Sequence, residues 1–419
     1  MTSTEISLDT IDIISPDHYA KNGYPHSEWA YLRQHKPVFH VDRPNVQPFW
    51  AITKHADIIQ ISRQPRLWLN GPRLSVFVVE PGEEVVVPPE AFPLRHLLNM
   101  DPPQHGEYRS VVSRQFTPRA VRALAPQIAE ITRKVLDDVA DRTECDFVTD
   151  MSSKVPVAVI AELLGVPRKD WEMLFRWTNE IIGGGDPEFQ SAGDPRETFE
   201  QARLGLFQYF TDMVAQRQKL PTNDITSIVA NAKVNGSPLP TMELLSYYLL
   251  LVVAGNETTR NATSGGLLAL MQNPEQFQRL KRDPALIKSA VEEIVRWTSP
   301  VIQFARTAVR DAEVRGQKIR AGESVCLFYP SANRDEEVFK EPFKFDVARN
   351  PNPHLAFGIG EHFCLGSHLA KLELEVIYRQ LAERMENPEL TGPVQRLRSS
   401  FVGGIKHMPI RYKMMPARN

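Results

Sequence analysis

The sequence has few cysteines, no long apolar run and no excess of charge of one sign. Its 419 residues hold only three cysteines, Cys145, Cys326 and Cys364, at spacings that match neither a zinc ribbon nor a thioredoxin motif. We therefore expect neither a disulfide framework nor a structural zinc site. The most apolar stretch, residues 244–254, is interrupted by Ser246 and is shorter than the ~20 residues that cross a bilayer. No membrane anchor is expected.

The charge balance and the first residues narrow the class of protein further. The chain has 49 Lys and Arg against 51 Asp and Glu, a net charge of −2, so it lacks the positive field of a general nucleic-acid or anionic-membrane binder. Residues 1–16 are polar and acidic and lack the basic and apolar regions of a secretory signal. We expect a cytoplasmic protein with no nucleic-acid partner.

The pattern of apolar residues predicts a mainly α fold with small β-sheets. The 33 prolines are dispersed rather than gathered into a linker, so we expect one domain over 1–419, with a β-rich part at about 1–100 and an α-rich remainder. Apolar residues at three- and four-residue intervals predict helices at 120–139, 155–164, 169–182, 196–218, 241–271 and 365–384. Strands are predicted at 38–41, 49–53, 307–314, 324–329 and 408–412.

The predicted helix 241–271 is long enough to be a central strut. It contains no proline and would run about 46 Å at ~1.5 Å per residue. Its middle, residues 254–259, reads Ala-Gly-Asn-Glu-Thr-Thr, and this places glycine, an acid and two hydroxyls after an apolar run. We expect these residues to loosen the helix, and such breaks in local rules mark function.

A glycine-rich loop with one cysteine is the most specific chemical signal. Residues 357–366 read Phe-Gly-Ile-Gly-Glu-His-Phe-Cys-Leu-Gly and precede a helical pattern. The glycines let the backbone bend around the sulfur of Cys364, and N–H groups near a helix N-terminus stabilise a thiolate. Such a thiolate could ligate a metal or attack a substrate. The alternative is a small buried residue in a glycine-rich turn.

This loop, with its pattern F-x-x-G-x-H-x-C-x-G, resembles the haem-binding loop of the cytochrome P450 family. Three other segments agree in order: residues 254–259 resemble the family's oxygen-activation stretch, 293–296 its E-x-x-R helix, and 345–349 the segment that supplies a second arginine. The resemblance covers nearly the full chain. It implies the cytochrome P450 fold, in which a long central helix crosses over a buried haem.

The resemblance also implies roles for individual residues. The cofactor would be haem b, with Cys364 as the thiolate ligand of its iron, which favours O–O cleavage. Other haem contacts, the first four of them to the propionates, would come from His105, Arg109, Arg306, His362, Phe357, Gly358, Gly366, Ala254 and Gly255. Glu293, Arg296 and Arg349 would form a buried structural network that fixes the cysteine loop.

Glu257 and Thr258 form an acid and alcohol pair on the predicted central helix. Such a pair relays protons to dioxygen through water, and the resemblance assigns it this catalytic role. The alternative is a helix cap or an exposed polar patch. We prefer the relay because the pair lies at the centre of an apolar helix, where unpartnered polar groups cost about 1–3 kcal/mol each.

The resemblance indicates the substrate class and the partners. Predicted pocket residues are Val76, Leu251, Ile302, Phe304, Phe401 and Val402, and residues 177–195 resemble a mobile lid. We expect a monooxygenase that hydroxylates an apolar molecule, with a sterol side chain or methyl-branched lipid favoured over a terpenoid. A peroxide-driven enzyme and a non-catalytic haem protein are further alternatives.

No part of the chain remains for a flavin or iron–sulfur segment, so two electrons per turnover would come from a separate ferredoxin and ferredoxin reductase. Arg109, Arg114, Arg119 and Arg122 have only Glu107 as a nearby acid and could dock an acidic ferredoxin. Alternatively, these arginines form a solvated helix face.

Overall fold

The computed structural model describes residues 7–71, 73–76, 78 and 94–416. Its α-helices are α1 (Pro16–Asn22), α2 (His26–His35), α3 (His55–Ser62), α4 (Gln104–Ser113), α5 (Pro118–Ala123), α6 (Ala125–Asp137), α7 (Lys154–Leu164), α8 (Trp171–Gly183), α9 (Pro195–Lys219), α10 (Ile225–Ala230), α11 (Thr241–Gln272), α12 (Pro274–Arg282), α13 (Ile287–Thr298), α14 (Tyr329–Ala332) and α15 (Ser367–Arg384). Shorter helical turns are η1 (Arg114–Phe116), η2 (Val148–Ser152), η3 (Arg168–Asp170), η4 (Pro187–Phe189) and η5 (Pro284–Leu286).

The strands form small sheets. They are β1 (Val38–Arg43), β2 (Val46–Ile52), β3 (Trp68–Leu69), β4 (Glu144–Asp146), β5 (Lys233–Val234), β6 (Ser237–Pro238), β7 (Gln303–Ala308), β8 (Ala312–Val314), β9 (Gln317–Ile319), β10 (Ser324–Phe328), β11 (Met385–Leu390), β12 (Gln395–Arg396), β13 (Ile405–His407) and β14 (Pro409–Met414). The largest sheet has the order β1-β2-β10-β7-β3.

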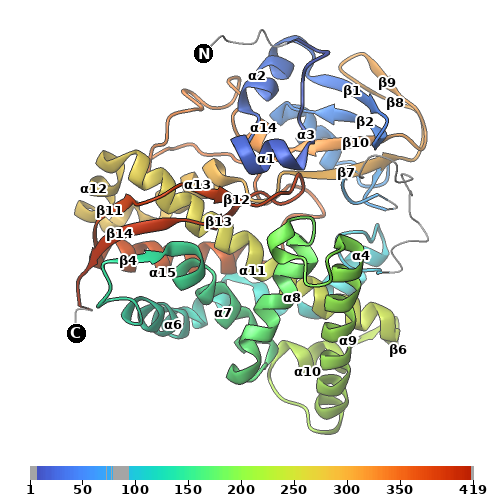
Figure 1. The fold of residues 1–419 in the computed structure, drawn as a ribbon. Helices are drawn as coiled ribbons and strands as arrows, with labels where there is room; N and C mark the ends of the chain where they lie inside the picture. The colour runs from blue at the N-terminus through green and yellow to red at the C-terminus, as the bar shows by residue number, and fades with distance from the viewer. Residues whose placement is uncertain (1–6, 72, 77, 79–93, 417–419) are drawn as a thin grey trace.

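Figure 1 shows a sheet-rich part and a larger helical part. The first contains β1, β2, β7 and β10 with α1, α2 and α3, and the second contains α4 and α6 to α11 with α15. The predicted mainly α fold with small sheets is therefore confirmed. None of the helices in the described residues is long and apolar enough to cross a membrane.

Most predicted helices are confirmed, but the prediction of one continuous helix over 120–139 is wrong. Helices α7, α9, α11 and α15 match their predicted spans within two residues. The predicted helix 120–139 is instead two helices, because α5 ends at Ala123 and α6 begins at Ala125. Pro126 lies in the first turn of α6, where a missing N–H costs nothing. The predicted strand 307–314 likewise divides into β7 and β8.

Helix α11 lies at the centre of the helical part. It packs against α7, α8, α9, α13 and α15, and most of its residues are buried. Gly266 has no side chain, so Tyr378 of α15 lies directly against α11 and donates its hydroxyl to the carbonyl of Thr263 (2.6 Å). These contacts fix the position of the 254–259 stretch within the fold.

The five-stranded sheet brings distant segments together. Strand β10 pairs in parallel with β2 and antiparallel with β7, so Cys326 lies opposite both Ala51 and Ala305. Because side chains alternate along a strand, Phe304 and Arg306 share the face of β7 opposite to that of the buried Ala305. The sheet thus positions Arg306 for the candidate site.

Candidate active site

Cys364 lies in a tight loop just before α15. Its backbone N–H donates to the carbonyl of Phe357 (2.9 Å), which closes the loop. Gly358 (φ +67°) and Gly360 (φ +80°) adopt the left-handed conformation that favours glycine. A Cβ atom on Gly360 would lie 2.5 Å from the carbonyl oxygen of Ser62, so this glycine also lets the loop approach the end of α3.

The surroundings of the Cys364 thiol include groups that favour its thiolate form. Burial raises the pKa of the thiol above its ordinary value, and the N–H of Gly366 and the positive charges of Arg109 and Lys371 offset only part of this rise. The ammonium of Lys371 also lies 5.2 Å from the ring centroid of Phe357. A metal ligand must be deprotonated, so these donors suit a cysteine that binds a metal ion.

Helix α4 brings two predicted residues against the cysteine loop. His105 is buried, and its Nδ1 lies 3.2 Å from Oε1 of Glu361. Its ring centroid lies 4.0 Å from that of His362. One turn further along α4, Arg109 donates through Nη2 to the carbonyl of Phe363 (2.7 Å). The helix therefore meets the loop with both side chains on one face, as their spacing predicts.

The fourth predicted propionate ligand, Arg306, adds another buried cation. It donates to the carbonyl of Ala305 (2.7 Å), and burial lowers its pKa. The pKa of His362 falls to about 2, first because of burial and then because of the positive charges of His105, Arg306 and Arg109. Nε2 of His362 is buried without a partner among the described residues. Positive charges thus lie around a polar atom that has no partner within the described part of the chain.

The centre of α11 is open on one side. Ala254 is exposed, and Gly255 and Thr258 are partly exposed, although most of the helix is buried. The hydroxyl of Thr258 donates to the carbonyl of Ala254 (2.9 Å), so its proton is satisfied within the helix. Helix α11 is continuous through this stretch, and small side chains rather than the predicted loosened backbone make the open side.

Glu257 lies in a buried polar cluster beside α8. Its carboxylate pairs with Arg260 and accepts from Nδ2 of Asn261 (3.2 Å). Arg260 also donates to Oδ1 of Asn179 on α8 (2.7 Å). The predicted acid and alcohol are therefore in different surroundings, since Thr258 borders the open side. Arg260, Asn261 and Asn179 were not predicted from the sequence, although the i, i+3 spacing of Glu257 and Arg260 was an available signal.

Glu293 on α13 forms the predicted charge network. Its two oxygens accept from Arg296 (2.7 and 2.8 Å) and from Nε of Arg349 (3.1 Å each). Nη1 of Arg296 also donates to the carbonyls of Asn333 (2.8 Å) and Pro342 (2.9 Å). These bonds join α13 to the chain between α14 and the cysteine loop, so the network holds the segment that leads to that loop.

The predicted pocket residues differ in their burial. They are Val76, Leu251, Ile302, Phe304, Phe401 and Val402. Val76 and Ile302 are completely buried in the core around β1, β2 and β10. Phe304 and Phe401 are partly exposed, and their ring centroids lie 5.6 Å apart. The aromatic pair is thus the part of the predicted wall with accessible surface.

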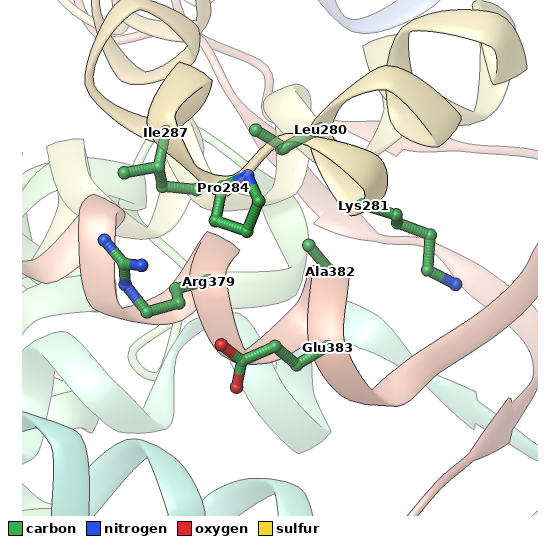
Figure 2. A pocket seen from close by; sticks show the side chains of 7 residues that line it. All are labelled: Leu280, Lys281, Pro284, Ile287, Arg379, Ala382 and Glu383. Atoms are coloured by element: carbon green, nitrogen blue, oxygen red, sulfur yellow. The ribbon is translucent and has the colours of Figure 1, made fainter.

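A small hollow elsewhere on the molecule holds none of the predicted site residues. It lies between α12, η5, α13 and α15 (Figure 2). Its lining consists of Leu280, Lys281, Pro284, Ile287, Arg379, Ala382 and Glu383. The ammonium of Lys281 already donates to the carbonyl of Met385 (2.7 Å). This hollow is therefore separate from the candidate site.

The residues around the cysteine loop suit the predicted haem. A haem carries two carboxylates on a flat ring with a central iron. The buried guanidinium of Arg306 and the unpartnered Nε2 of His362 are the kinds of donor that carboxylates accept from. The sulfur of Cys364 suits the iron, and the open side of α11 at Ala254 carries no bulky side chain.

Comparisons with known proteins agree with this geometry. The family profile described as Cytochrome P450 matches residues 192–387. The chain is 37% identical to Cytochrome P450-terp of Pseudomonas sp, over 96% of each chain. It is 38% identical to the steroid C26-monooxygenase of Mycolicibacterium smegmatis, over 93% of this chain and 90% of that protein.

A solved structure shares the fold over its full length. The cytochrome P450 of Mycobacterium marinum in complex with pseudoionone is 34% identical and has a TM-score of 0.88, over 98% of this chain and 100% of that one. Relatives of this similarity extend over nearly the whole sequence, including the cysteine loop and the central helix. The chain therefore belongs to the cytochrome P450 family and is a haem-dependent monooxygenase.

Proposed function

We propose that this cytochrome P450 hydroxylates an apolar, branched small molecule, with a sterol side chain or a methyl-branched lipid favoured. The open side of α11 at Ala254 carries the proposal, because the neighbouring Leu251 and Val253 are apolar. Phe304 and Phe401 add accessible aromatic surface, which suits an apolar ligand. The steroid monooxygenase of M. smegmatis and the M. marinum protein with pseudoionone support this ligand class.

Residues from the cysteine loop, α4 and β7 would hold the haem. Cys364 would bind the iron through its sulfur, and His105, Arg109, Arg306 and His362 would bind the propionates. Contacts with the ring would come from Phe357, Gly358, Gly366, Ala254 and Gly255. When bound, the haem supplies the activation of dioxygen and the insertion of one oxygen atom into a C–H bond.

Glu257 and Thr258 would deliver protons to the open side of α11. Oε2 of Glu257 is buried and has no partner among the described residues, so it is available to a water molecule. Thr258 donates its own proton to Ala254, which leaves its oxygen lone pairs available to accept from water. Once Oε2 of Glu257 takes up a proton from solvent water, it would donate that proton to a water molecule whose own O–H donates to the oxygen of Thr258, and this water would release a proton on the open side of α11.

A ferredoxin and its reductase would supply the electrons. Arg114, Arg119 and Arg122 are exposed, and a cationic surface of this kind attracts an acidic ferredoxin. Phe363, next to Cys364, is 40% exposed and offers an apolar contact close to the sulfur. We place the reaction in the cytoplasm, where the protein's free cysteines would stay reduced.

A terpenoid hydroxylase is the second candidate. The structural neighbour from M. marinum binds pseudoionone, which is an open-chain terpenoid ketone. Such a ligand shares the methyl branches of the favoured lipids and lacks the fused rings of a sterol. The two candidates therefore differ in the size and rigidity of the molecule that the pocket accepts.

An optical titration tests the proposal. Ferric protein is titrated with sterols, methyl-branched fatty acids, monoterpenoids and linear alkanoic acids while the Soret band is followed. We expect a saturable shift to high spin with sterols or branched lipids, because a ligand that fills the site expels water from it. A shift with monoterpenoids alone supports the second candidate.

The control for this titration is the reduced protein with carbon monoxide. A red-shifted Soret band reports thiolate ligation, and Cys364→Ser should abolish that band. If the band is present and no ligand class shifts the ferric protein, the apolar-lipid proposal is wrong. If the band is absent in the unmodified protein, the assignment of Cys364 fails first.

A further inference from the structure

Gln303 is a buried amide at the start of β7 with an unusual set of partners. Its side chain is only 1% exposed. The N–H of Val76 donates to Oε1 of Gln303 (3.2 Å), and Nε2 donates back to the carbonyl of Val76 (2.9 Å). One amide therefore binds both backbone groups of one residue, as a paired strand does.

The same amide reaches two further segments. The thiol of Cys326 on β10 donates to Oε1 (3.2 Å), and Nε2 also lies 3.5 Å from the carbonyl of Ser400. Gln303 thus joins the segment 73–76, strand β10 and the turn 399–402. Buried amides with this many partners restrict the relative positions of the groups that they bind.

Backbone bonds on either side of Gln303 involve the same two segments. The N–H of Ala305 donates to the carbonyl of Leu74 (2.7 Å), and the N–H of Ile302 donates to that of Phe401 (2.9 Å). Gln303 lies between these two bonds along β7. Its side chain therefore sets the distances from β7 to the segment 73–76 and to the turn 399–402, at the position where both are bonded to the chain around Gln303.

The opposite face of β7 carries the aromatic part of the predicted pocket. Phe304 and Arg306 alternate with the buried Gln303 and Ala305, so they point to the other face of the strand. The ring of Phe304 lies edge-on to that of Phe401, at an interplanar angle of 68°. Gln303 consequently lies on the face of β7 opposite to the aromatic pair, and it bonds the predicted pocket residue Val76 only through that residue's backbone groups.

We propose that Gln303 is a positioning residue for substrate specificity. Its amide fixes the distance between β7 and the turn 399–402, and through it the position of Phe401 against Phe304. The pair in turn decides how an apolar substrate lies in the pocket and which of its C–H bonds is oxidised. This inference rests on the proposed function, because it needs that aromatic pair to line the substrate pocket.

Gln303→Leu tests the proposal by removing both hydrogen-bonding groups while keeping the approximate size. We expect the dissociation constant from the Soret titration to rise about tenfold, since the wall loses its fixed spacing. The ratio of products from the preferred substrate should also broaden. Gln303→Met, a more flexible apolar replacement, serves the same purpose if the leucine variant does not accumulate.

Gln303→Glu should restore the unmodified behaviour. A carboxyl group buried between the carbonyls of Val76 and Ser400 stays protonated, so it accepts from one partner and donates to another as the amide does. Near-normal binding and a normal product ratio are therefore expected for this variant. A merely structural cavity effect would not distinguish leucine from glutamate in this way.

Gln276→Leu is the matched control. Gln276 on α12 is also buried, and its Oε1 accepts from the backbone N–H of Val347 (3.2 Å), but it touches none of the predicted pocket residues within the described part of the chain. We expect a similar loss of thermal stability with unchanged ligand binding and product ratio. Equal changes in binding for both leucine variants would show general loosening and overturn the proposal.

An unchanged dissociation constant and product ratio in Gln303→Leu would also overturn it. Failure of the proposed function is a separate result, because it would show in the unmodified protein as no spin shift with any ligand class. Thermal unfolding and haem content, measured on the same samples, keep loss of folding distinct from loss of positioning.

Discussion

Two helices of this protein carry the same pattern, a buried glutamate followed three positions later by an arginine. In α13, the charged groups of Glu293 and Arg296 have a partner at every oxygen and nitrogen. In α11, Oε2 of Glu257 and Nε of Arg260 have none among the described residues. The spacing fixes the ion pair in both helices, and the surroundings decide whether the pair is complete.

The surroundings differ because of the chain that packs against each helix. Around Glu293, the backbone N–H of Asp346 (3.0 Å) and the amide of Asn352 (3.1 Å) add donors to the carboxylate. Around Glu257, the neighbouring Asn256 has neither side-chain atom paired within the described residues. A complete network acts as a scaffold, whereas an incomplete one leaves atoms to bind water, as proton delivery requires.

Breaking the complete network should have the largest effect on stability. Glu293→Gln removes the charge that the buried Arg296 and the partly exposed Arg349 share and should lower the free energy of unfolding by about 3–5 kcal/mol. Haem should be lost at lower urea concentrations as well. Urea unfolding followed by circular dichroism and by the Soret band measures both.

Glu292→Gln is the control for that measurement. Glu292 is one position earlier and partly exposed, with His354 (2.9 Å) and Lys371 (2.7 Å) as partners. Its replacement should cost at most about 1 kcal/mol. If Glu293→Gln is as stable as Glu292→Gln, the network around Glu293 is not a structural scaffold.

Breaking the incomplete network should affect turnover more than stability. Glu257→Gln keeps an oxygen and the size of the side chain but removes the acid, so dioxygen-driven turnover should fall about 100-fold. Turnover driven by hydrogen peroxide should fall far less, since the peroxide already carries its protons. Product formation with each oxidant measures the difference, and Thr259→Ser on the same helix should change neither.

Local patterns in the sequence predict the helices well because apolar spacing reports burial directly. Helix α7 begins one residue before its predicted span, and helix α9 extends one residue beyond its predicted span at each end. The break at Leu124 escaped prediction, although Pro126 marked it, because Ala120 to Val139 keeps an apolar periodicity across the break. Periodicity shows which face is buried but not whether one helix or two provide it.

The candidate site was predictable only as a set of residues. Cys364 and its glycines stand within ten positions of each other, and their loop closes through local bonds. His105 and Glu361 are 256 positions apart, and nothing in either segment indicates that one binds the other. Sequence also could not separate Glu257 from Thr258, since a one-residue step on a helix turns side chains to different surroundings.

Arg306 extends the comparison between complete and incomplete networks to a buried cation whose predicted partner is the haem. Arg306→Leu should leave the unfolding free energy of the haem-free chain within about 1 kcal/mol, because burying a guanidinium that has no ion pair among the described residues already costs stability. Haem affinity should fall about tenfold through loss of a charge-assisted bond. Urea unfolding of the haem-free chain and haem transfer to apomyoglobin measure the two quantities.

Arg310→Leu, at an exposed position just beyond β7, should change neither quantity. If the haem-free Arg306→Leu chain is several kcal/mol less stable than the unmodified chain, this arginine stabilises the fold even without the haem. Arg306 would then be a structural residue like Arg296 and not a residue whose main partner is the haem.

The predicted lid, residues 177–195, is joined to β13 by a network that is complete only while His407 is protonated. His407 on β13 lies between Asp146 (Nδ1 to Oδ2, 2.5 Å) and Glu188 of the lid (Nε2 to Oε1, 2.7 Å). Burial lowers the pKa of His407, but these hydrogen bonds outweigh it and the net pKa is raised. The two carboxylates thus favour the protonated form of His407 between the predicted lid and β13.

The sign of the pH dependence follows from that shift. A raised pKa in the folded state gives stability that is fully present below the unfolded value of about 6.5 and is lost as pH rises through the folded value. The lid should therefore open more readily as pH rises. The effect should stay below about 1 kcal/mol, because the site is partly exposed and Lys406 still pairs with Asp186 and Glu188 at both extremes.

Hydrogen exchange of the lid backbone, corrected for the intrinsic effect of pH, measures this opening. The unmodified protein should lose protection in residues 183–195 as pH rises, and His407→Gln should show low protection with little pH dependence. His18→Gln, outside the lid, should behave like the unmodified protein. Arg398 also bonds the predicted lid, through Nη1 to the carbonyl of Gly185 (3.1 Å). If His407→Gln keeps the full pH dependence, Lys406 and Arg398 hold the predicted lid without it, and the protonated histidine does not complete the network.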